Sequence, residues 1–254
     1  MNMSLLITTV LFDYPSTYEP SFCKTGIERG LYQTDIHVQR YNSDGVSPPC
    51  SWSNNVYESL MSKLRWYKIH KHLEYLTEIQ SKYEYTLFLD ATDTNFTKNV
   101  DGMLDEYLKY GHDIVMCAEK GLWPPTPYNH LYETIGASTS YKYLNSGCMI
   151  GKTTAIISAL QYAVDSDDPN VSFAGDDQGI WATLYLLKKA DIVLDEDQRL
   201  FFSTHLSKDK TVLDHLGNPI GIDASAYVIH DNGPWGEETI KLTEACNIRQ
   251  LETR

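Results

Sequence analysis

Short runs of apolar residues alternate along the chain with longer stretches in which apolar residues recur at helical spacing. The short runs predict buried strands, because a strand covered on both faces has few polar side chains. We expect strands near residues 4–11, 36–41, 85–90, 113–118, 192–194 and 226–230. We expect helices at residues 57–82, 100–110, 153–165 and 176–189. Strands separated by helices indicate an α/β fold with a central, mostly parallel sheet covered by helices.

The remaining segments are predicted to be loops and bends. Residues 42–55 are rich in Ser, Asn, Pro and Gly, and residues 120–130 are rich in proline. Within residues 143–151 the triplet Asn-Ser-Gly lies between apolar flanks, which predicts a bend. The chain has 254 residues, a length that suits one α/β domain, so we expect a single domain over residues 1–254.

The strand expected at 85–90 ends in two carboxylates, Asp90 and Asp93. The carboxyl ends of strands in such sheets bind ligands, and two acidic side chains three residues apart can converge on one hard cation there. Mg²⁺ or Mn²⁺ bound to one or two carboxylates and bridging the phosphates of a substrate is the usual purpose of that arrangement. The alternative is that both aspartates cap the next turn or helix.

The charge of the chain argues against one class of partner. Its formal net charge is −13, whereas binding along a nucleic-acid backbone needs clustered Lys and Arg. One dense basic group consists of Lys63, Arg65, Lys68 and Lys71. It indicates either the solvated face of a helix or a local basic groove.

The cysteines and the N-terminal sequence indicate the compartment. The five cysteines form no CxxC pair, so a disulfide framework or a zinc site is not expected. The apolar run at residues 4–10 follows no basic segment and is too short for a signal peptide or a membrane span. We therefore expect a cytoplasmic protein without a membrane partner.

Two further segments offer polar groups at turns. Asn145 precedes Ser146 and Gly147; the amide and the hydroxyl could hydrogen-bond sugar hydroxyls, or the segment is a structural turn. Asp176 and Asp177 open the helix expected at 176–189. They could contact an acceptor hydroxyl, or they cap the helix and interact with its dipole.

Two more residues are candidates for a site at the same edge. His230 ends the last expected strand and could add an imidazole to the cation of Asp90 and Asp93, although a lone histidine is more often structural. Imidazole suits Mn²⁺ better than Mg²⁺. Trp123 lies in the proline-rich loop, which is either a lid that stacks on a sugar or a stiff surface loop.

Taken in order, these motifs resemble one known family. The pattern is a strand with D-x-x-D, a strand with Ala-Glu followed by Trp-Pro, then Leu-Asn-Ser-Gly, Asp-Asp-Gln and Val-Ile-His-x-Asn-Gly-Pro. It is similar to the glycosyltransferase domain of the procollagen lysyl hydroxylases and the related collagen-type galactosyl- and glucosyltransferases. The likeness extends over residues 5–234.

The resemblance implies a GT-A fold and transfer of glucose or galactose from a UDP-sugar, with Mn²⁺ or possibly Mg²⁺ as cofactor and with retention of configuration. It implies that Asp90, Asp93 and His230 bind the metal. It implies nucleotide contacts from Thr8, Thr9, Lys63, Asp90, Thr92 and Gly233. It implies a donor-sugar and acceptor side formed by Trp123, Asn145, Asp176 and Asp177, with one of the two aspartates as base or charge stabiliser.

The sequence also departs from that family. Thr92 replaces the usual aromatic residue between the aspartates, Cys148 replaces a second glycine, and Trp235 and Gly236 stand in place of Thr-Lys. Without a dioxygenase domain or a secretory signal in this sequence, we do not expect collagen hydroxylysine as the acceptor. The hydroxyl acceptor is instead a glycan, a protein, a small molecule or a modified nucleobase in DNA.

Two other functional classes stay open. A sugar-nucleotide hydrolase or a nucleotidyltransferase usually carries a glycine-rich loop after the first strand, and residues 8–15 contain no glycine. A non-catalytic module that binds a sugar nucleotide is the least expected, because all three metal-ligand candidates are present.

Overall fold

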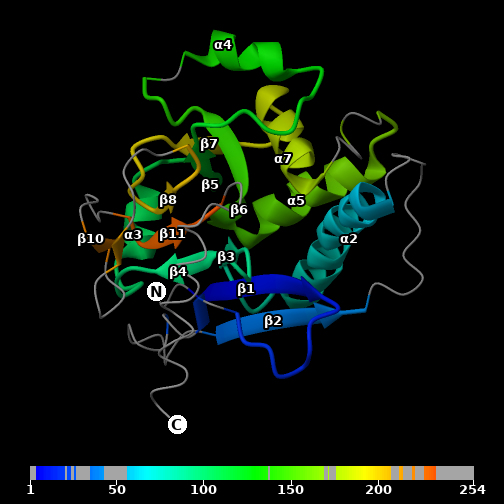
Figure 1. Cartoon of the computed structure of the whole chain (residues 1–254), viewed down its shortest axis with the longest axis vertical. Helices are drawn as coiled ribbons and strands as arrows, with labels where there is room; N and C mark the ends of the chain where they lie inside the picture. The colour runs from blue at the N-terminus through cyan, green and yellow to red at the C-terminus, as the bar shows by residue number, and fades with distance from the viewer. Residues whose placement is uncertain are drawn as a thin grey trace.

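The computed structural model describes residues 4–20, 22–23, 26, 35–42, 56–136, 138–168, 171, 176–206, 212–213, 219–220 and 226–232 (Figure 1). Its centre is a six-stranded sheet in the order β2-β1-β3-β6-β5-β7. The strands are β1 (Leu5–Phe12), β2 (Asp35–Tyr41), β3 (Tyr85–Leu89), β5 (Ile114–Glu119), β6 (Tyr143–Lys152) and β7 (Ile192–Asp195). Only β6 runs against its neighbours, so the sheet is mostly parallel and the predicted α/β class is confirmed.

Helices cover one face of this sheet. They are α2 (Val56–Ile79), α5 (Thr153–Asp165) and α7 (Asp177–Leu186), which pack against one another on the same side (Figure 1). Side chains alternate along a strand, and Leu6 and Val10 of β1 therefore join Phe88 of β3 in the core beneath these helices. Burial of this apolar face fixes the helices over the strands.

The opposite face carries a second, smaller layer. It contains α3 (Met103–Leu108) and a three-stranded sheet in the order β4-β11-β8, made of Thr94–Phe96, Val228–His230 and Phe201–Ser203. Ile7, Leu87 and Leu89 point to this side and pack in a core with Met103 and Phe201. The small sheet brings segments far apart in the sequence next to the end of β3.

Shorter elements complete the described chain. The loop after β5 contains the 3₁₀ helix η2 (Asn129–Leu131) and α4 (Tyr132–Ile135). A two-stranded ribbon pairs β9 (Val212–Leu213) with β10 (Pro219–Ile220). Among the described helices, none combines the length and the apolar character needed to cross a bilayer.

The predicted bend at residues 143–151 is wrong. These residues form the continuous strand β6, but the pairing with β5 is irregular: Met116 lies opposite Met149, whereas Cys117 lies opposite Asn145. The extra residues form a β-bulge, which re-aims side chains without ending the strand. The polar triplet therefore lies inside the sheet, at the level of the carboxyl end of β3, where the Asp90 N–H donates to the Gly147 carbonyl at 2.7 Å.

Candidate active site

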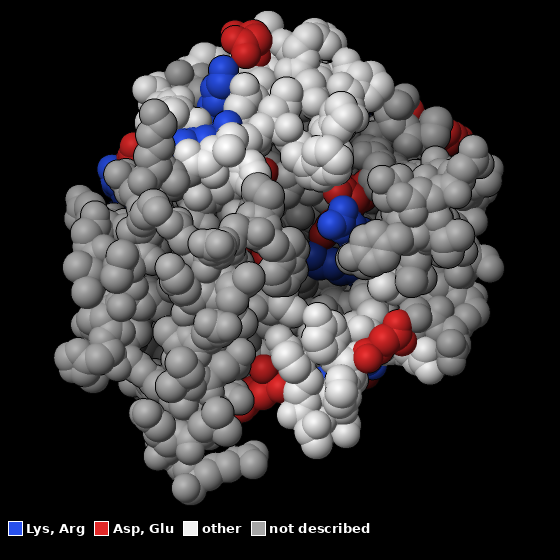
Figure 2. All heavy atoms as spheres, in the orientation of Figure 1, with Lys and Arg blue, Asp and Glu red and all other residues white. Residues whose placement is uncertain are grey.

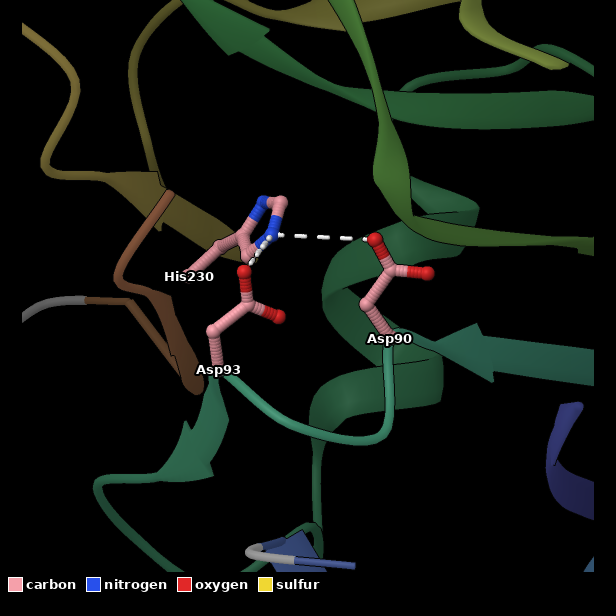
Figure 3. A group of neighbouring side chains, drawn as sticks. All are labelled: Asp90, Asp93 and His230. Atoms are coloured by element: carbon pink, nitrogen blue, oxygen red, sulfur yellow. Dashed lines mark ion pairs between the residues drawn. The ribbon is translucent and has the colours of Figure 1, made fainter. Parts of the chain in front are cut away.

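Three potential metal ligands converge at the end of β3 (Figure 3). Asp90 directly follows β3, and Asp93 follows after a short turn, just before β4. Strand β4 pairs antiparallel with β11 so that Thr94 lies opposite His230, which brings Asp93 beside the imidazole. His230 Nε2 lies 3.4 Å from Asp93 Oδ2 and 3.9 Å from Asp90 Oδ2. One donor atom from each residue lies within 4.8 Å of the others.

Two of these donor atoms lack hydrogen-bond partners. His230 Nε2 and Asp93 Oδ1 are buried and make no hydrogen bond. Buried polar atoms are nearly always satisfied, so these two need a partner that the described residues do not supply. Carboxylate oxygens with one imidazole nitrogen form a donor set that suits Mn²⁺ and, less well, Mg²⁺. The residues present therefore fit a divalent cation.

Asn145 fixes the orientation of the imidazole. Its Oδ1 accepts the Gly147 N–H at 2.9 Å, which identifies that atom as the amide oxygen. The same oxygen lies 2.9 Å from His230 Nδ1, so Nδ1 carries a proton and donates it. In the neutral ring the lone pair is then on Nε2, the nitrogen that faces the two aspartates.

Gly147 leaves the space that the ring occupies. A Cβ at this position would lie 2.1 Å from His230 Cε1, far inside van der Waals contact. The glycine of the Asn-Ser-Gly triplet is therefore required by the close approach of β6 to the imidazole.

Electrostatics couple the histidine and the aspartate. Burial disfavours the charged form of both side chains, but their mutual attraction outweighs it. Burial raises the pKa of the Asp93 carboxyl, but the nearby His230 lowers it more and holds the pKa below its usual value. The carboxylates, Asp93 first, likewise raise the pKa of His230 against the effect of its burial.

A second acidic cluster lies at the start of α7. Asp176 is the N-cap of this helix, since its Oδ1 accepts the Gly179 N–H at 2.8 Å; the capping interpretation is confirmed for this residue. Its Oδ2 accepts hydrogen bonds from Arg65 Nη1 at 3.0 Å and from Trp123 Nε1 at 3.3 Å. Asp176 therefore connects the N-terminus of α7 to Arg65 of α2 and to Trp123 in the loop after β5.

Lys68 connects the two acidic clusters. Its Nζ lies 2.7 Å from Asp90 Oδ1 and 2.6 Å from Asp177 Oδ2, and Asp177 also accepts from Ser146 Oγ at 3.4 Å. Burial lowers the pKa of Lys68, but the charges of Asp177 and Asp90 outweigh it and raise the pKa above its usual value. On the face in Figure 2, basic and acidic atoms meet in a hollow.

The basic group on α2 is only partly a solvated helix face. Arg65 is 42% exposed, as a solvated face requires, whereas the side chains of Lys68 and Lys71 are only 15% and 19% exposed. The three-residue spacing of Arg65 and Lys68 places both on the helix side that meets α7. That spacing was the available sequence signal, but their acidic partners at the start of α7 lie more than 100 residues away.

A buried carboxylate that the sequence analysis did not single out organises the rim. Glu119, the last residue of β5, accepts hydrogen bonds from Gln178 Nε2 at 2.8 Å and from Asn232 Nδ2 at 2.6 Å. Gln178 Nε2 also donates to the Trp123 carbonyl at 2.8 Å. Burial raises the pKa of Glu119, and these hydrogen bonds act in the opposite direction. The network anchors the Trp123 loop, while the indole itself is 58% exposed.

The other residues predicted to contact the nucleotide differ in burial, and two of them lie partly or wholly outside the described part of the structure. Thr8 and Thr9 are fully buried in β1; the Thr8 hydroxyl donates to the His37 carbonyl, and the Thr9 hydroxyl has no hydrogen-bond partner in the part of the chain that the structure describes. Thr92 is exposed in the turn between the two aspartates. Lys63 belongs to α2, but its side chain lies outside the described part of the structure, as does all of Gly233.

Comparison with known proteins identifies one family that matches most of the chain. The model of the family described as "PLOD GT domain" matches residues 62–245. The human "Multifunctional procollagen lysine hydroxylase and glycosyltransferase LH3" is 28% identical over 181 residues, which are 68% of this chain and 23% of that protein. The "Procollagen-lysine,2-oxoglutarate 5-dioxygenase" of Drosophila melanogaster is 27% identical over 158 residues, 58% of this chain and 21% of that protein. The chain thus spans about a quarter or less of the length of these relatives.

A solved structure shares the fold. It is described as a "glycosyltransferase involved in the glycosylation of the major capsid of PBCV-1" and superposes with a TM-score of 0.52 at 10% identity. The match covers 96% of this chain and 99% of the other. This likeness agrees with the GT-A architecture that the sequence motifs predicted.

Proposed function

The chain belongs to the family described as the PLOD GT domain, and from this premise we propose that it is a metal-dependent enzyme that transfers a hexose from a UDP-sugar to a hydroxyl acceptor. The observation that carries the proposal is that two buried ligand atoms beside Asp90, His230 Nε2 and Asp93 Oδ1, make no hydrogen bond to any described residue. As the family resemblance implies, we expect glucose or galactose as the sugar and retention of its configuration.

Asp90, Asp93 and His230 would hold the cation, Mn²⁺ by preference. Bound there, the cation supplies Lewis-acid stabilisation of the negative charge on the departing diphosphate. Asn145 then has a positioning role, because its oxygen is already engaged by Gly147 and by His230. It orients the imidazole and does not have to touch the sugar.

Asp177 is the better candidate of the acidic pair for the reacting centre. Both oxygens of Asp176 are engaged by the helix N-terminus, Arg65 and Trp123, which suits a positioning residue. Asp177 is joined to Asp90 through the single ammonium group of Lys68. We assign to its carboxylate either stabilisation of the positive charge that develops on the sugar or acceptance of the acceptor proton.

The Trp123 loop is proposed to close over the donor. Its anchors are Gln178 and Asp176, which belong to the acidic helix start itself, and its indole is largely exposed. Closure would exclude water, so that the sugar reaches a hydroxyl acceptor and is not hydrolysed. Arg65 lies beside the same rim through its ion pair with Asp176.

Calorimetric titration with UDP tests the proposal. We expect UDP to bind the protein in the presence of Mn²⁺ and to bind much more weakly without it. Asp93→Ala should abolish this Mn²⁺ dependence without unfolding the protein, whereas Asp105→Ala, which changes an exposed aspartate on α3, should bind as the unmodified protein does. Equal affinity of Asp93→Ala and the unmodified protein would remove Asp93 from the site.

A further inference from the structure

The loop that follows β1 presents two tyrosines whose rings are in tilted contact. Tyr14 and Tyr18 have ring centroids 4.5 Å apart, with an angle of 40° between the ring planes. Tyr14 is 43% exposed, whereas Tyr18 is less exposed. The Tyr14 ring is thus partly open to solvent and packed against Tyr18.

Hydrogen bonds hold this loop in place. Arg40 of β2 donates through Nη1 to the Pro15 carbonyl at 3.3 Å and through Nη2 to the Tyr18 carbonyl at 2.5 Å. The Tyr18 N–H closes a turn on the Pro15 carbonyl at 2.9 Å, and the Asp13 N–H donates to the Tyr41 carbonyl at 3.1 Å. A ring held this way loses little conformational freedom when a ligand stacks on it.

The tyrosine pair shares an edge of the sheet with the metal ligands. Strands β1 and β3 run parallel and in register from Leu5 opposite Tyr85 to Thr8 opposite Phe88, so both end at the edge where such sheets bind ligands. Burial raises the pKa of both phenols, and the negative charge of Asp93 acts in the same direction; at Tyr18, where Tyr14 contributes more than Asp93, the pKa rises to about 12. The tyrosine loop and the turn that carries Asp90 and Asp93 thus follow strand ends at the same edge of the sheet.

We propose that Tyr14, backed by Tyr18, is the surface on which the nucleobase of the sugar nucleotide stacks. The inference rests on the proposed function, because it needs the diphosphate to lie at Asp90, Asp93 and His230. Thr92, in the turn between the aspartates, has no ring to offer. Stacking on an aromatic face accepts any base, so Tyr14 contributes affinity for the base and little selectivity among bases.

Two ligands that differ only beyond the phosphates separate this role from the metal site. Calorimetry with Mn²⁺ would measure UDP and inorganic pyrophosphate on the unmodified protein, Tyr14→Ser, Tyr14→Phe and a control, Tyr162→Ser. Tyr162, on α5, is 40% exposed and so matches Tyr14 in exposure. Near-UV circular dichroism and thermal unfolding would verify that each variant is folded.

We expect Tyr14→Ser to bind UDP about 5- to 100-fold more weakly, the range expected for loss of one base–aromatic stack, and to bind pyrophosphate unchanged. Tyr14→Phe and Tyr162→Ser should match the unmodified protein with both ligands. Unchanged UDP affinity in Tyr14→Ser, or an equal loss for UDP and pyrophosphate, would overturn the inference. If the unmodified protein bound neither ligand with Mn²⁺, the proposed function itself would fail, and the inference with it.

Discussion

At the scale of single residues, Asn145 decides which nitrogen of His230 can bind a metal. Because the Gly147 N–H can only donate, the atom that contacts it is the amide oxygen, and that oxygen takes the Nδ1 proton of the imidazole. The Nε2 lone pair is then directed toward Asp90 and Asp93. Such supporting contacts typically change metal affinity by about 10- to 100-fold when they are removed.

Asn145→Leu should therefore weaken Mn²⁺ binding by about 10- to 100-fold, measured by electron paramagnetic resonance of free Mn²⁺ during titration. Asn145→Asp keeps an acceptor oxygen at the same place and should recover most of the affinity. A merely structural role would not distinguish the two variants in this way. Equal Mn²⁺ affinities of the leucine and aspartate variants would contradict the positioning role.

Sequence reasoning found residues whose local setting is distinctive and missed those defined by distant partners. Asp90 and Asp93 stand out because carboxylates end an apolar strand, and His230 stands out in the same way. Lys68 and Glu119 look ordinary in sequence, since their partners Asp177 and Asn232 lie 109 and 113 residues away. The roles of these two residues depend on tertiary packing, which no local pattern encodes.

At the scale of elements, the site exists because α2, β3 and α7 meet at Lys68. This ammonium group from α2 contacts the residue that follows β3 and the first residue of α7. Its side chain is 15% exposed, so the two ion pairs are shielded from solvent far more than surface pairs are. Removal of the Lys68 ammonium group leaves Asp90 and Asp177 as uncompensated charges.

Lys68→Met should lower the free energy of unfolding by about 3 kcal/mol in the absence of metal. Addition of Mn²⁺ should reduce this deficit, because a cation at Asp90 replaces part of the missing positive charge. Urea unfolding with and without Mn²⁺ measures both effects.

Lys142→Met is the matched control, since Lys142 pairs with the largely exposed Glu133 and should contribute far less to stability than Lys68 does. A loss in Lys68→Met as small as in this control would show that the Lys68 ion pairs do not hold the three elements together.

The long elements were predictable, whereas the short ones were not. The helix expected at 153–165 matches α5, and the strands of the central sheet other than β6 lie within a residue or two of the predicted ranges. Strands β4 and β8 have three residues each, too few for a periodic pattern. The bulge in β6 was taken for a bend because Asn-Ser-Gly is typical of both.

At the scale of the whole molecule, a histidine lies in the core under the helices. His72 of α2 is 2% exposed, and its ring centroid lies 4.8 Å from that of Phe88 at an interplanar angle of 42°. Among the described residues, its Nε2 has no hydrogen-bond partner. Burial, followed by the charge of Lys68, lowers the pKa of His72 to about 3. The folded protein therefore keeps this ring neutral at pH values where the unfolded chain protonates it.

The stability of the protein should consequently fall with pH below about 6.5, the ordinary pKa of histidine. Between about pH 6.5 and 3 only the unfolded state takes up this proton, so protonation favours unfolding. From pH 7.5 to 5, urea unfolding should show about 2 kcal/mol more loss in the unmodified protein than in His72→Leu. The exposed-site variant His130→Leu should behave as the unmodified protein does, and parallel losses in all three proteins would exclude His72 as the cause.

The central claim is that Asp90, Asp93 and His230 bind one divalent cation together. Crystals grown with Mn²⁺ and UDP, measured at the manganese absorption edge, test it most directly. The account predicts an anomalous peak within bonding distance of both carboxylates and of His230 Nε2, in contact with the diphosphate. A manganese peak elsewhere on the protein, with UDP bound and these three side chains free of metal, would contradict it.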